Sequence, residues 1–224
     1  MSKDTPVPSP DVVLARLGPP VTEKIFVEDR TFLIGRPSES DKPIDDETPD
    51  AYTPYWADLW PAARMLANVI LHESWTPGTE ALELGCGLGL PGIVGLSRGL
   101  KVTFSDVDEC ALRFAAANAR LNGFSDVQTL MLDWRYPPAD LRFPIILGAD
   151  LIYEACHAEL LASVIQRLLA PGGMCWLTDL ERLPARLLHQ ALQEGGLQFE
   201  MQMVRAGEPG GRRFKGTLYR IHLP

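Results

Sequence analysis

The sequence predicts an α/β fold built on a doubly wound, mostly parallel β-sheet, and three observations support this prediction. Strand-like and helix-like segments alternate from residue 80 to residue 194, a pattern typical of parallel sheets with helices on both faces. The run 144–149 is almost continuously apolar, as is common in strands that are covered on both faces. Two strand-like segments, 197–205 and 212–222, then follow each other directly and predict a terminal antiparallel hairpin.

The individual elements follow from apolar spacing and from residues that start or stop helices. A helix should begin after Pro61, because apolar residues recur at helical spacing through Leu71. Asp108 is suited to cap the start of another helix, which Asn122-Gly123 should end. The remaining strands are expected at 80–84, 101–105, 127–132, 144–149 and 174–178, and the remaining helices near 91–98, around 160–168 and at 184–194.

Residues 1–50 are expected to form an N-terminal extension to one domain that spans residues 51–224. Five prolines in the first 20 residues favour partial disorder there. Residues 24–34 are typical of two short strands that form a β-hairpin around the turn Glu28-Asp29-Arg30. The acidic stretch 37–50 is expected to be a loop, either a plain linker or a mobile lid.

The composition excludes several classes of protein. The 224 residues include 29 acids and 21 bases, and the net charge of −8 argues against a nucleic-acid partner. Four cysteines lie far apart, so neither a metal site nor a redox pair is indicated, and reduced thiols in a cytoplasmic protein are expected. We see no signal peptide and no run long enough to span a membrane. The oligomeric state stays open.

A glycine-rich loop follows the strand expected at 80–84. Its glycines alternate with other residues at Gly85, Gly87 and Gly89. A strand, such a loop and a helix start together lay a ligand against bare backbone amides. The loop lacks the Gly-Lys-Ser/Thr of a phosphate-binding loop, and Leu90 stands where a dinucleotide-binding loop has glycine. Glu83 is costly to bury unless a cationic ligand head or backbone amides pair with it.

Acidic residues end four successive strands: Glu83, Asp106, Asp133 and Asp150. Ligands bind at this edge of a doubly wound sheet. The spacing in sequence between the glycine loop and Asp106 is about that found for acids that bind both hydroxyls of a ribose. A role as a helix cap is the alternative for Asp106. Asp133 could accept from an adenine amine while Trp134 stacks on the ring, unless that ring only fills the core. S-adenosylmethionine, an adenosine with a charged head and no phosphates, fits this set.

The motif Glu83-Leu-Gly-Cys-Gly-Leu-Gly89 resembles the first motif of class I, seven-stranded, Rossmann-like methyltransferases that use S-adenosylmethionine. Three further features resemble methyltransferase family 16, which contains many protein lysine methyltransferases: Trp60-Pro-Ala-Ala63, Asp133-Trp134 and Asp150-Leu-Ile-Tyr153. The aromatic run 54–57 is similar to bacterial relatives of the enzyme that methylates the electron-transfer flavoprotein β subunit. The resemblance covers roughly residues 50–180.

The resemblance and the strand-end pattern imply a set of site residues. Those expected to bind the cofactor are Trp60, Glu83, Gly85, Cys86, Gly87, Gly89, Asp106, Asp133, Trp134 and Ala149. Asp150 and Tyr153 are expected to be catalytic, where cofactor and substrate meet; a helix cap and a packed aromatic ring are the alternatives. Glu154 and His157 lie close enough to move protons, but a solvated helix face is favoured for them.

The expected activity is methyl transfer from S-adenosylmethionine to a lysine side chain of a protein. A small amine or a pyridine such as nicotinamide is an alternative acceptor, since some bacterial relatives carry that label. A module that binds the cofactor without catalysis is a third possibility, disfavoured by the intact motif after the fourth strand. That motif is not the Asn-Pro-Pro-Tyr of amide-methylating relatives, which argues against glutamine and nucleic-acid bases.

Overall fold

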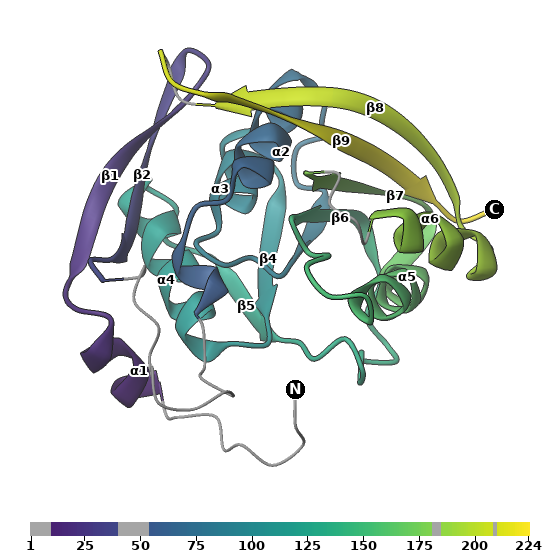
Figure 1. Ribbon diagram of the computed structural model, residues 1–224, viewed down its shortest axis with the longest axis horizontal. Helices are drawn as coiled ribbons and strands as arrows, with labels where there is room; N and C mark the ends of the chain where they lie inside the picture. The colour runs from purple at the N-terminus through teal and green to yellow at the C-terminus, as the bar shows by residue number, and fades with distance from the viewer. Residues whose placement is uncertain (1–9, 40–53, 181–184, 208–209) are drawn as a thin grey trace.

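The computed structural model describes residues 10–39, 54–180, 185–207 and 210–224. A seven-stranded sheet carries helices on both faces, and a two-stranded hairpin lies beside it (Figure 1). The strand order is β5-β4-β3-β6-β7-β9-β8. Strands β3 to β7 run parallel, and β9 runs antiparallel to both of its neighbours. The predicted doubly wound α/β fold with a terminal antiparallel hairpin is therefore confirmed.

The expected elements of this sheet are present, with small shifts at their ends. The strands are β3 (Glu80–Leu84), β4 (Lys101–Asp106), β5 (Gln128–Met131), β6 (Phe143–Ala149), β7 (Leu169–Asp179), β8 (Gln198–Gly207) and β9 (Arg213–His222). The helices are η1 (Tyr55–Ala57), α2 (Pro61–His72), α3 (Leu90–Ser97), α4 (Glu109–Leu121), α5 (His157–Leu168) and α6 (Ala185–Glu194). The largest shift is in β7, which begins directly after α5, so that Pro171-Gly172-Gly173 lies within an irregular start of the strand.

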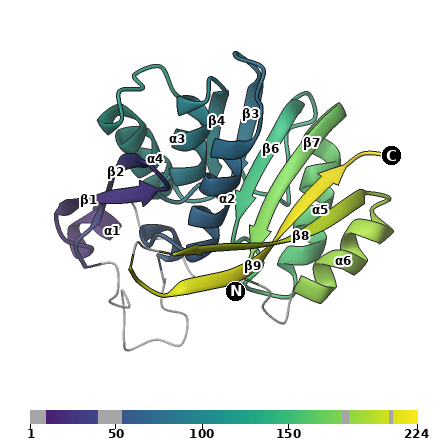
Figure 2. The same cartoon turned by 90° about the horizontal axis from the view of Figure 1, so that it is seen from above.

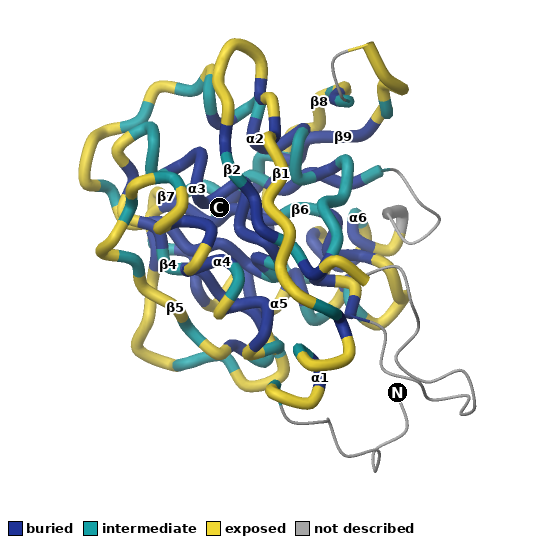
Figure 3. Tube along the Cα trace, turned by 90° about the vertical axis from the view of Figure 1, so that its left-hand side faces the viewer, coloured by how far each residue is buried: buried dark blue, intermediate teal, exposed yellow. Residues whose placement is uncertain are grey.

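Two apolar clusters fill the two faces of the sheet. Figure 2 shows the helices on the two sides of the sheet, and Figure 3 shows the buried chain between them. One joins α2, α3 and α4 to the sheet around Phe104, and the other joins α5 and α6 to it around Ile146. Successive residues of β3 contribute to opposite clusters, with Ala81 in the first and Leu82 in the second. This central strand is therefore buried on both sides, which holds the loop that follows it in one place. No helix among the described residues is long and apolar enough to cross a membrane.

The N-terminal part contains one expected element and one unexpected element. Strands β1 (Pro20–Val27) and β2 (Arg30–Pro37) form the predicted hairpin, with Glu28 in the left-handed conformation at its turn. The helix α1 (Pro10–Arg16) was not expected, and it is held by Val13, which is buried, and by Leu14, which packs against the core. Residues 1–9, the candidate lid from residue 40 onward and the domain boundary at residue 50 lie outside the described residues.

Asn118 on α4 ties the N-terminal hairpin to the glycine loop. Its side-chain amide accepts from Gly35 N at 2.7 Å and donates to Gly35 O at 3.0 Å, as a neighbouring strand would do. The same Nδ2 donates to the carbonyl of Leu88 at 2.9 Å. Because Asn118 is fully buried, these bonds are protected from water and fix one side of the loop.

Candidate functional site

The candidate site lies at the carboxyl edge of the sheet, where the order of the strands reverses. The chain moves outward from β3 through β4 to β5, and then returns to β6 on the other side of β3. A reversal of this kind leaves the ends of two adjacent strands without a crossing connection, which is where α/β sheets bind ligands. The glycine loop after β3 and Asp150 after β6 flank this point, and Asp106 ends β4 beside it.

The glycine loop brings its backbone against neighbouring residues at two positions. Gly85 has φ 54°, and a Cβ there would lie 2.6 Å from Leu151 Cδ2. Gly87 has φ 49°, and a Cβ there would lie 3.2 Å from the carbonyl oxygen of Trp56. Side chains are therefore excluded by backbone conformation and by space. Gly89, also left-handed, caps α3, so the helix begins directly behind the loop.

Cys86 supports the loop through its backbone. Its N–H donates to Ser105 O on β4 at 2.9 Å, and its carbonyl accepts from Gly89 N at 2.7 Å. Burial, followed by the negative charges of Asp106 and Glu83, raises the pKa of the Cys86 thiol well above its ordinary value. The thiol therefore stays protonated at neutral pH and is unsuited to act as a nucleophile.

Glu83 lies behind the glycine loop. Only 2% of its surface is exposed, and its Oε2 accepts from Gly92 N in the first turn of α3 at 3.0 Å. The sequence left two possible partners for Glu83, a cationic ligand head or backbone amides. The structure shows a backbone amide in this role. Burial raises the pKa of Glu83 well above 4.5, its ordinary value, and the Gly92 hydrogen bond only partly offsets this. Glu83 is placed to hold the loop against the helix start.

The raised pKa of Glu83 predicts a pH-dependent stability. The folded chain keeps a proton that the unfolded chain releases above about pH 4.5. The wild type therefore loses free energy of unfolding as the pH rises between the two pKa values, by at most about 1.4 kcal/mol per pH unit. Glu83→Gln keeps an acceptor for Gly92 and does not titrate, so it should gain stability relative to the wild type over this range. Urea unfolding at a series of pH values measures the difference.

The matched control for this prediction is Glu80→Gln, at the exposed start of the same strand. The pH-dependent gain should be absent there. A stability difference between wild type and Glu83→Gln that stays constant as the pH rises would contradict a raised pKa of Glu83.

Asp106 organises the loop from the neighbouring strand. Its Oδ2 accepts from Gly87 N and its Oδ1 from Asp108 N, both at 3.0 Å. Burial raises the pKa of Asp106, and these backbone hydrogen bonds oppose that rise. Two carboxylate oxygens offer about four acceptor positions, so the carboxylate keeps acceptor capacity for a ligand hydroxyl. Asp108, not Asp106, caps α4 by accepting from Cys110 N at 2.8 Å, which confirms the predicted cap.

Asp133 has a partner that the sequence analysis did not anticipate. Its carboxylate accepts from Nε and Nη2 of Arg135 and from the Arg135 backbone N–H. The Arg135 guanidinium lowers the pKa of Asp133. An adenine amine would therefore share this carboxylate with an arginine. Trp134 is half-buried, and its ring lies 3.7 Å from the position of a Cβ on Gly85, so it stands against the loop.

Asp150 has an unusual backbone for a residue that is not glycine. It follows the half-buried Ala149 at the end of β6, has φ 59°, and exposes 7% of its surface. Its N–H donates to Thr178 O on β7 at 2.8 Å. A left-handed aspartate costs on the order of 1 kcal/mol. The neighbouring strand holds this conformation, which turns the chain at the switch point and is typical of functional positions.

Three aromatic side chains, Tyr55, Trp60 and Tyr153, lie together near the acidic residues at the strand ends. Tyr153 is 48% exposed, and its ring packs edge-on against His157 with centroids 4.3 Å apart. Tyr55 lies 5.3 Å from Tyr153 and 6.4 Å from Trp60, whose Nε1 donates to the Tyr55 carbonyl. Burial, followed by the charge of Asp106, raises the pKa of Tyr153. We refer to Tyr55, Trp60 and Tyr153 as the aromatic wall.

Three features of the site differ from the sequence analysis or were absent from it. His157 is half-buried between Tyr153 and Trp134, so the favoured solvated helix face is wrong for this residue, and burial lowers its pKa. Tyr55 belongs to the aromatic wall but was not predicted as a site residue. The only indication in the sequence was its position in the aromatic run 54–57. Asp179 ends β7 with 1% exposure and adds a fifth acid at a strand end, which an extension of the strand-end pattern would have found.

The comparisons with known proteins agree with this geometry. A family model described as lysine methyltransferase matches residues 50–187, more than half of the chain. The chain belongs to this lysine methyltransferase family. It is 32% identical to histone-arginine methyltransferase METTL23 of Rattus norvegicus, over 55% of this chain and 59% of the relative. It is 29% identical to protein-lysine N-methyltransferase rrg1 of Schizosaccharomyces pombe, over 72% and 58% respectively.

A further relative has a name that states a different acceptor, histidine. The histidine protein methyltransferase 1 homolog of Dictyostelium discoideum is 32% identical over 54% of this chain and 41% of its own length. This chain spans about half the length of the curated relatives it matches.

Solved structures confirm the methyltransferase type of fold. The N-methyltransferase NodS of Bradyrhizobium japonicum, in complex with S-adenosyl-L-homocysteine, matches with a TM-score of 0.60 at 19% identity, over 81% of this chain and 94% of that one. A ribosomal protein L11 methylase of Lactobacillus delbrueckii matches with a TM-score of 0.56 at 23% identity, over 73% and 79% respectively. At these identities the similarity concerns the fold.

Proposed function

We propose that this chain is an S-adenosylmethionine-dependent N-methyltransferase that methylates a lysine side chain of a protein. One observation carries the proposal: the glycine loop, Asp106 and the left-handed Asp150 meet at the point where the strand order reverses. Membership of the lysine methyltransferase family supports the reaction type. The named relatives modify protein side chains at nitrogen-bearing arginine, histidine or lysine residues, which favours a protein acceptor over a small amine or pyridine.

The residues at the site fit S-adenosylmethionine. Gly85 and Gly87 leave no room for side chains, so the loop presents bare backbone at this edge of the sheet. No basic residue lies between Glu80 and Gly92, which suits a cofactor without phosphates. In this proposal Asp106 accepts from the ribose hydroxyls, the loop holds the methionine head, and Trp134 covers the adenine. Glu83, Cys86 and Gly89 shape the loop, while Trp60 and Ala149 border the cofactor.

Catalysis in this proposal depends on placing the acceptor nitrogen. When bound, S-adenosylmethionine supplies a methyl group on a positively charged sulfur. The carboxylate of Asp150 draws the lysine ammonium in, and the faces of the aromatic wall attract the same cation. After deprotonation, the neutral amine is held for in-line attack on the methyl group, with S-adenosylhomocysteine as the leaving group. A nearby carboxylate also raises the pKa of the amine. Because this rise opposes deprotonation, the mechanism requires that the lysine lose its proton to water before the wall encloses it, and Tyr153 holds the alkyl chain.

Methylation of a cell extract tests this proposal. The protein is incubated with extract and labelled S-adenosylmethionine, and labelled proteins are separated from metabolites. Labelled protein is then hydrolysed to amino acids. We expect methyl-lysine. Methyl-arginine or methyl-histidine would keep protein methylation but overturn the lysine assignment, and label confined to small molecules would favour the small-amine alternative. Absence of both transfer and cofactor binding would reject the methyltransferase assignment.

A further inference from the structure

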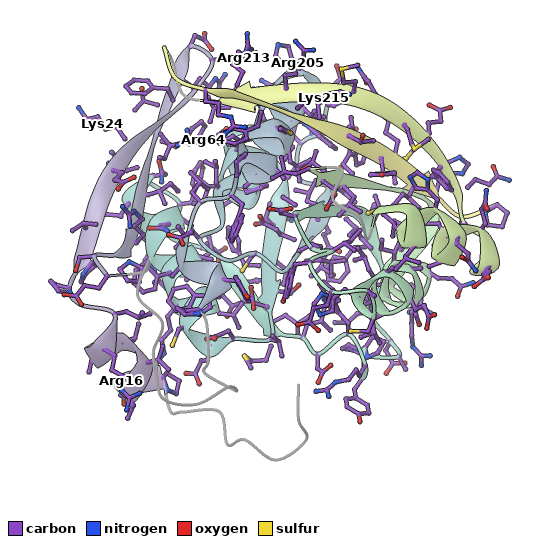
Figure 4. The ribbon with its side chains drawn as sticks, in the orientation of Figure 1. Arg16, Lys24, Arg64, Arg205, Arg213 and Lys215 are labelled. Atoms are coloured by element: carbon purple, nitrogen blue, oxygen red, sulfur yellow. The ribbon has the colours of Figure 1, made fainter. Side chains whose placement is uncertain are left out.

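The free end of the β8–β9 hairpin is basic in an acidic protein. The net charge of the chain is −8, yet residues 204–215 contain four bases and one acid. All four bases are exposed, and Arg205, Arg213 and Lys215 among them lie on one face of the hairpin. Figure 4 shows these three side chains together along the upper rim of the molecule, above α2. Solubility does not require positive charges to gather at one place in a chain that is already strongly negative.

The three bases share one face of the hairpin. Arg205 stands directly opposite Lys215, and Gly207 stands opposite Arg213, in the antiparallel register of β8 and β9. Directly opposite residues lie on the same face, and like charges in such a pair destabilise the sheet. The direct pairing of Arg205 with Lys215 is therefore unfavourable within the strand pair. This arrangement is better explained by a negatively charged partner that binds to this face.

The basic end of the hairpin projects beyond the edge that carries the candidate site. The pairing of β9 with β7 stops at Thr217, which lies opposite Asp179 at the carboxyl end of β7. Residues 213–216 therefore extend roughly 13 Å past that edge at 3.3 Å per residue. Asp150 is two strands away, roughly 10 Å across the sheet. A substrate segment whose lysine is at Asp150 would therefore reach the hairpin with residues about four or five positions away.

The rest of the face fits a protein better than a nucleic acid. Met201 and Met203 precede Arg205 at every second position on β8 and are 55% and 57% exposed. They extend the face with apolar, adaptable side chains, which are common at protein interfaces. The apolar part of this row, followed by its basic part, matches a segment that presents apolar residues and then acidic residues to the face.

We propose that this face, formed by Met201, Met203, Arg205, Arg213 and Lys215, docks an acidic segment of the protein substrate. The inference deepens the proposed function, on which it rests, because it assigns the charge of the region beside the acceptor lysine. The face stands apart from the cofactor residues, so docking and cofactor binding can be measured separately.

Binding of a peptide without lysine tests the docking face independently of catalysis. The probe is a fluorescent peptide with a leucine-rich half followed by a glutamate-rich half, and the comparison peptide has glutamine in place of glutamate. We expect the full chain to bind the glutamate peptide more tightly, and the Arg205→Glu/Arg213→Glu variant to bind it about tenfold more weakly. High salt should remove most of the difference.

The control is Arg120→Glu/Arg167→Glu, which changes the net charge equally. Both arginines are exposed in the last turns of α4 and α5, at the helix ends far from the carboxyl edge. Equal peptide binding by the two double variants would overturn the proposal, as would failure of the wild type to prefer the glutamate peptide. Tighter binding of a single-stranded RNA that depends on Arg205 and Arg213 would also overturn it, in favour of a nucleic-acid surface.

A second readout separates this inference from the proposed function. Each variant is titrated with S-adenosylhomocysteine, and methyl transfer to a glutamate–leucine peptide with one lysine is followed. Peptide binding that depends on the hairpin, without methyl transfer or cofactor binding, would reject the proposed function alone. Methyl transfer at equal rates to glutamate and glutamine peptides, without selective binding, would reject the docking face alone.

Discussion

The Asp106→Ala variant is expected to bind S-adenosylhomocysteine about 100-fold to 1000-fold more weakly than the wild type, because two charged hydrogen bonds of about 1.5–2 kcal/mol each are lost. In the proposed function these bonds join the carboxylate to the two ribose hydroxyls. The substitution also removes the acceptor of Gly87 N, which loosens the loop that faces the ligand. Titration calorimetry measures the change in affinity, and unfolding of the unbound variant shows whether the fold is intact.

Asp108→Ala is the matched control for this prediction. Asp108 is two residues away and accepts from Cys110 N at the start of α4, so its loss should cost about 1 kcal/mol of stability while affinity for the cofactor product stays close to that of the wild type. If Asp106→Ala binds as tightly as the wild type, Asp106 does not hold the ribose. If both variants lose affinity equally, the helix start rather than the carboxylate determines binding.

The sequence predicted the sheet well because its signals are local. Ala81 and Leu82 belong to a short apolar run between a turn and a glycine loop, and burial on both faces requires such a run. Asp108 could be identified as a helix cap because it stands directly before residues with helical apolar spacing. Alternation of strands and helices then fixed which ends meet at the same edge. The approximate location of the candidate site followed from that edge.

Pairings between side chains could not be predicted in the same way. Glu83 accepts from Gly92 because the helix start folds back behind the strand. Neither a glutamate nor a glycine in the sequence indicates that contact. Asp133 and Arg135 form an ion pair in a loop, where no period fixes the direction of side chains. Tyr55 and Tyr153 are far apart in sequence and meet only because η1 and the chain after β6 converge. Each of these depends on tertiary packing, which spacing alone does not encode.

The Asp150→Asn variant is expected to transfer methyl groups about 100-fold more slowly, since positioned catalytic groups commonly contribute factors of this size, while its affinity for S-adenosylhomocysteine changes little. Asparagine keeps the size of the side chain and tolerates the left-handed backbone of this position, at φ 59°. The substitution therefore removes the charge without adding strain. Initial rates with labelled S-adenosylmethionine and the acceptor protein, together with calorimetry, separate the two effects.

Two further variants complete this test. Asp150→Ala removes the charge and also places a residue unsuited to the left-handed conformation at the strand end, so it should lose stability as well as rate. Asp126→Asn makes the same chemical change at an exposed position before β5 and should retain the wild-type rate. Full turnover by Asp150→Asn would show that the carboxylate does not orient the acceptor. A loss of cofactor affinity equal to the loss of rate would instead place Asp150 in cofactor binding, because the ammonium acceptor is absent from that titration.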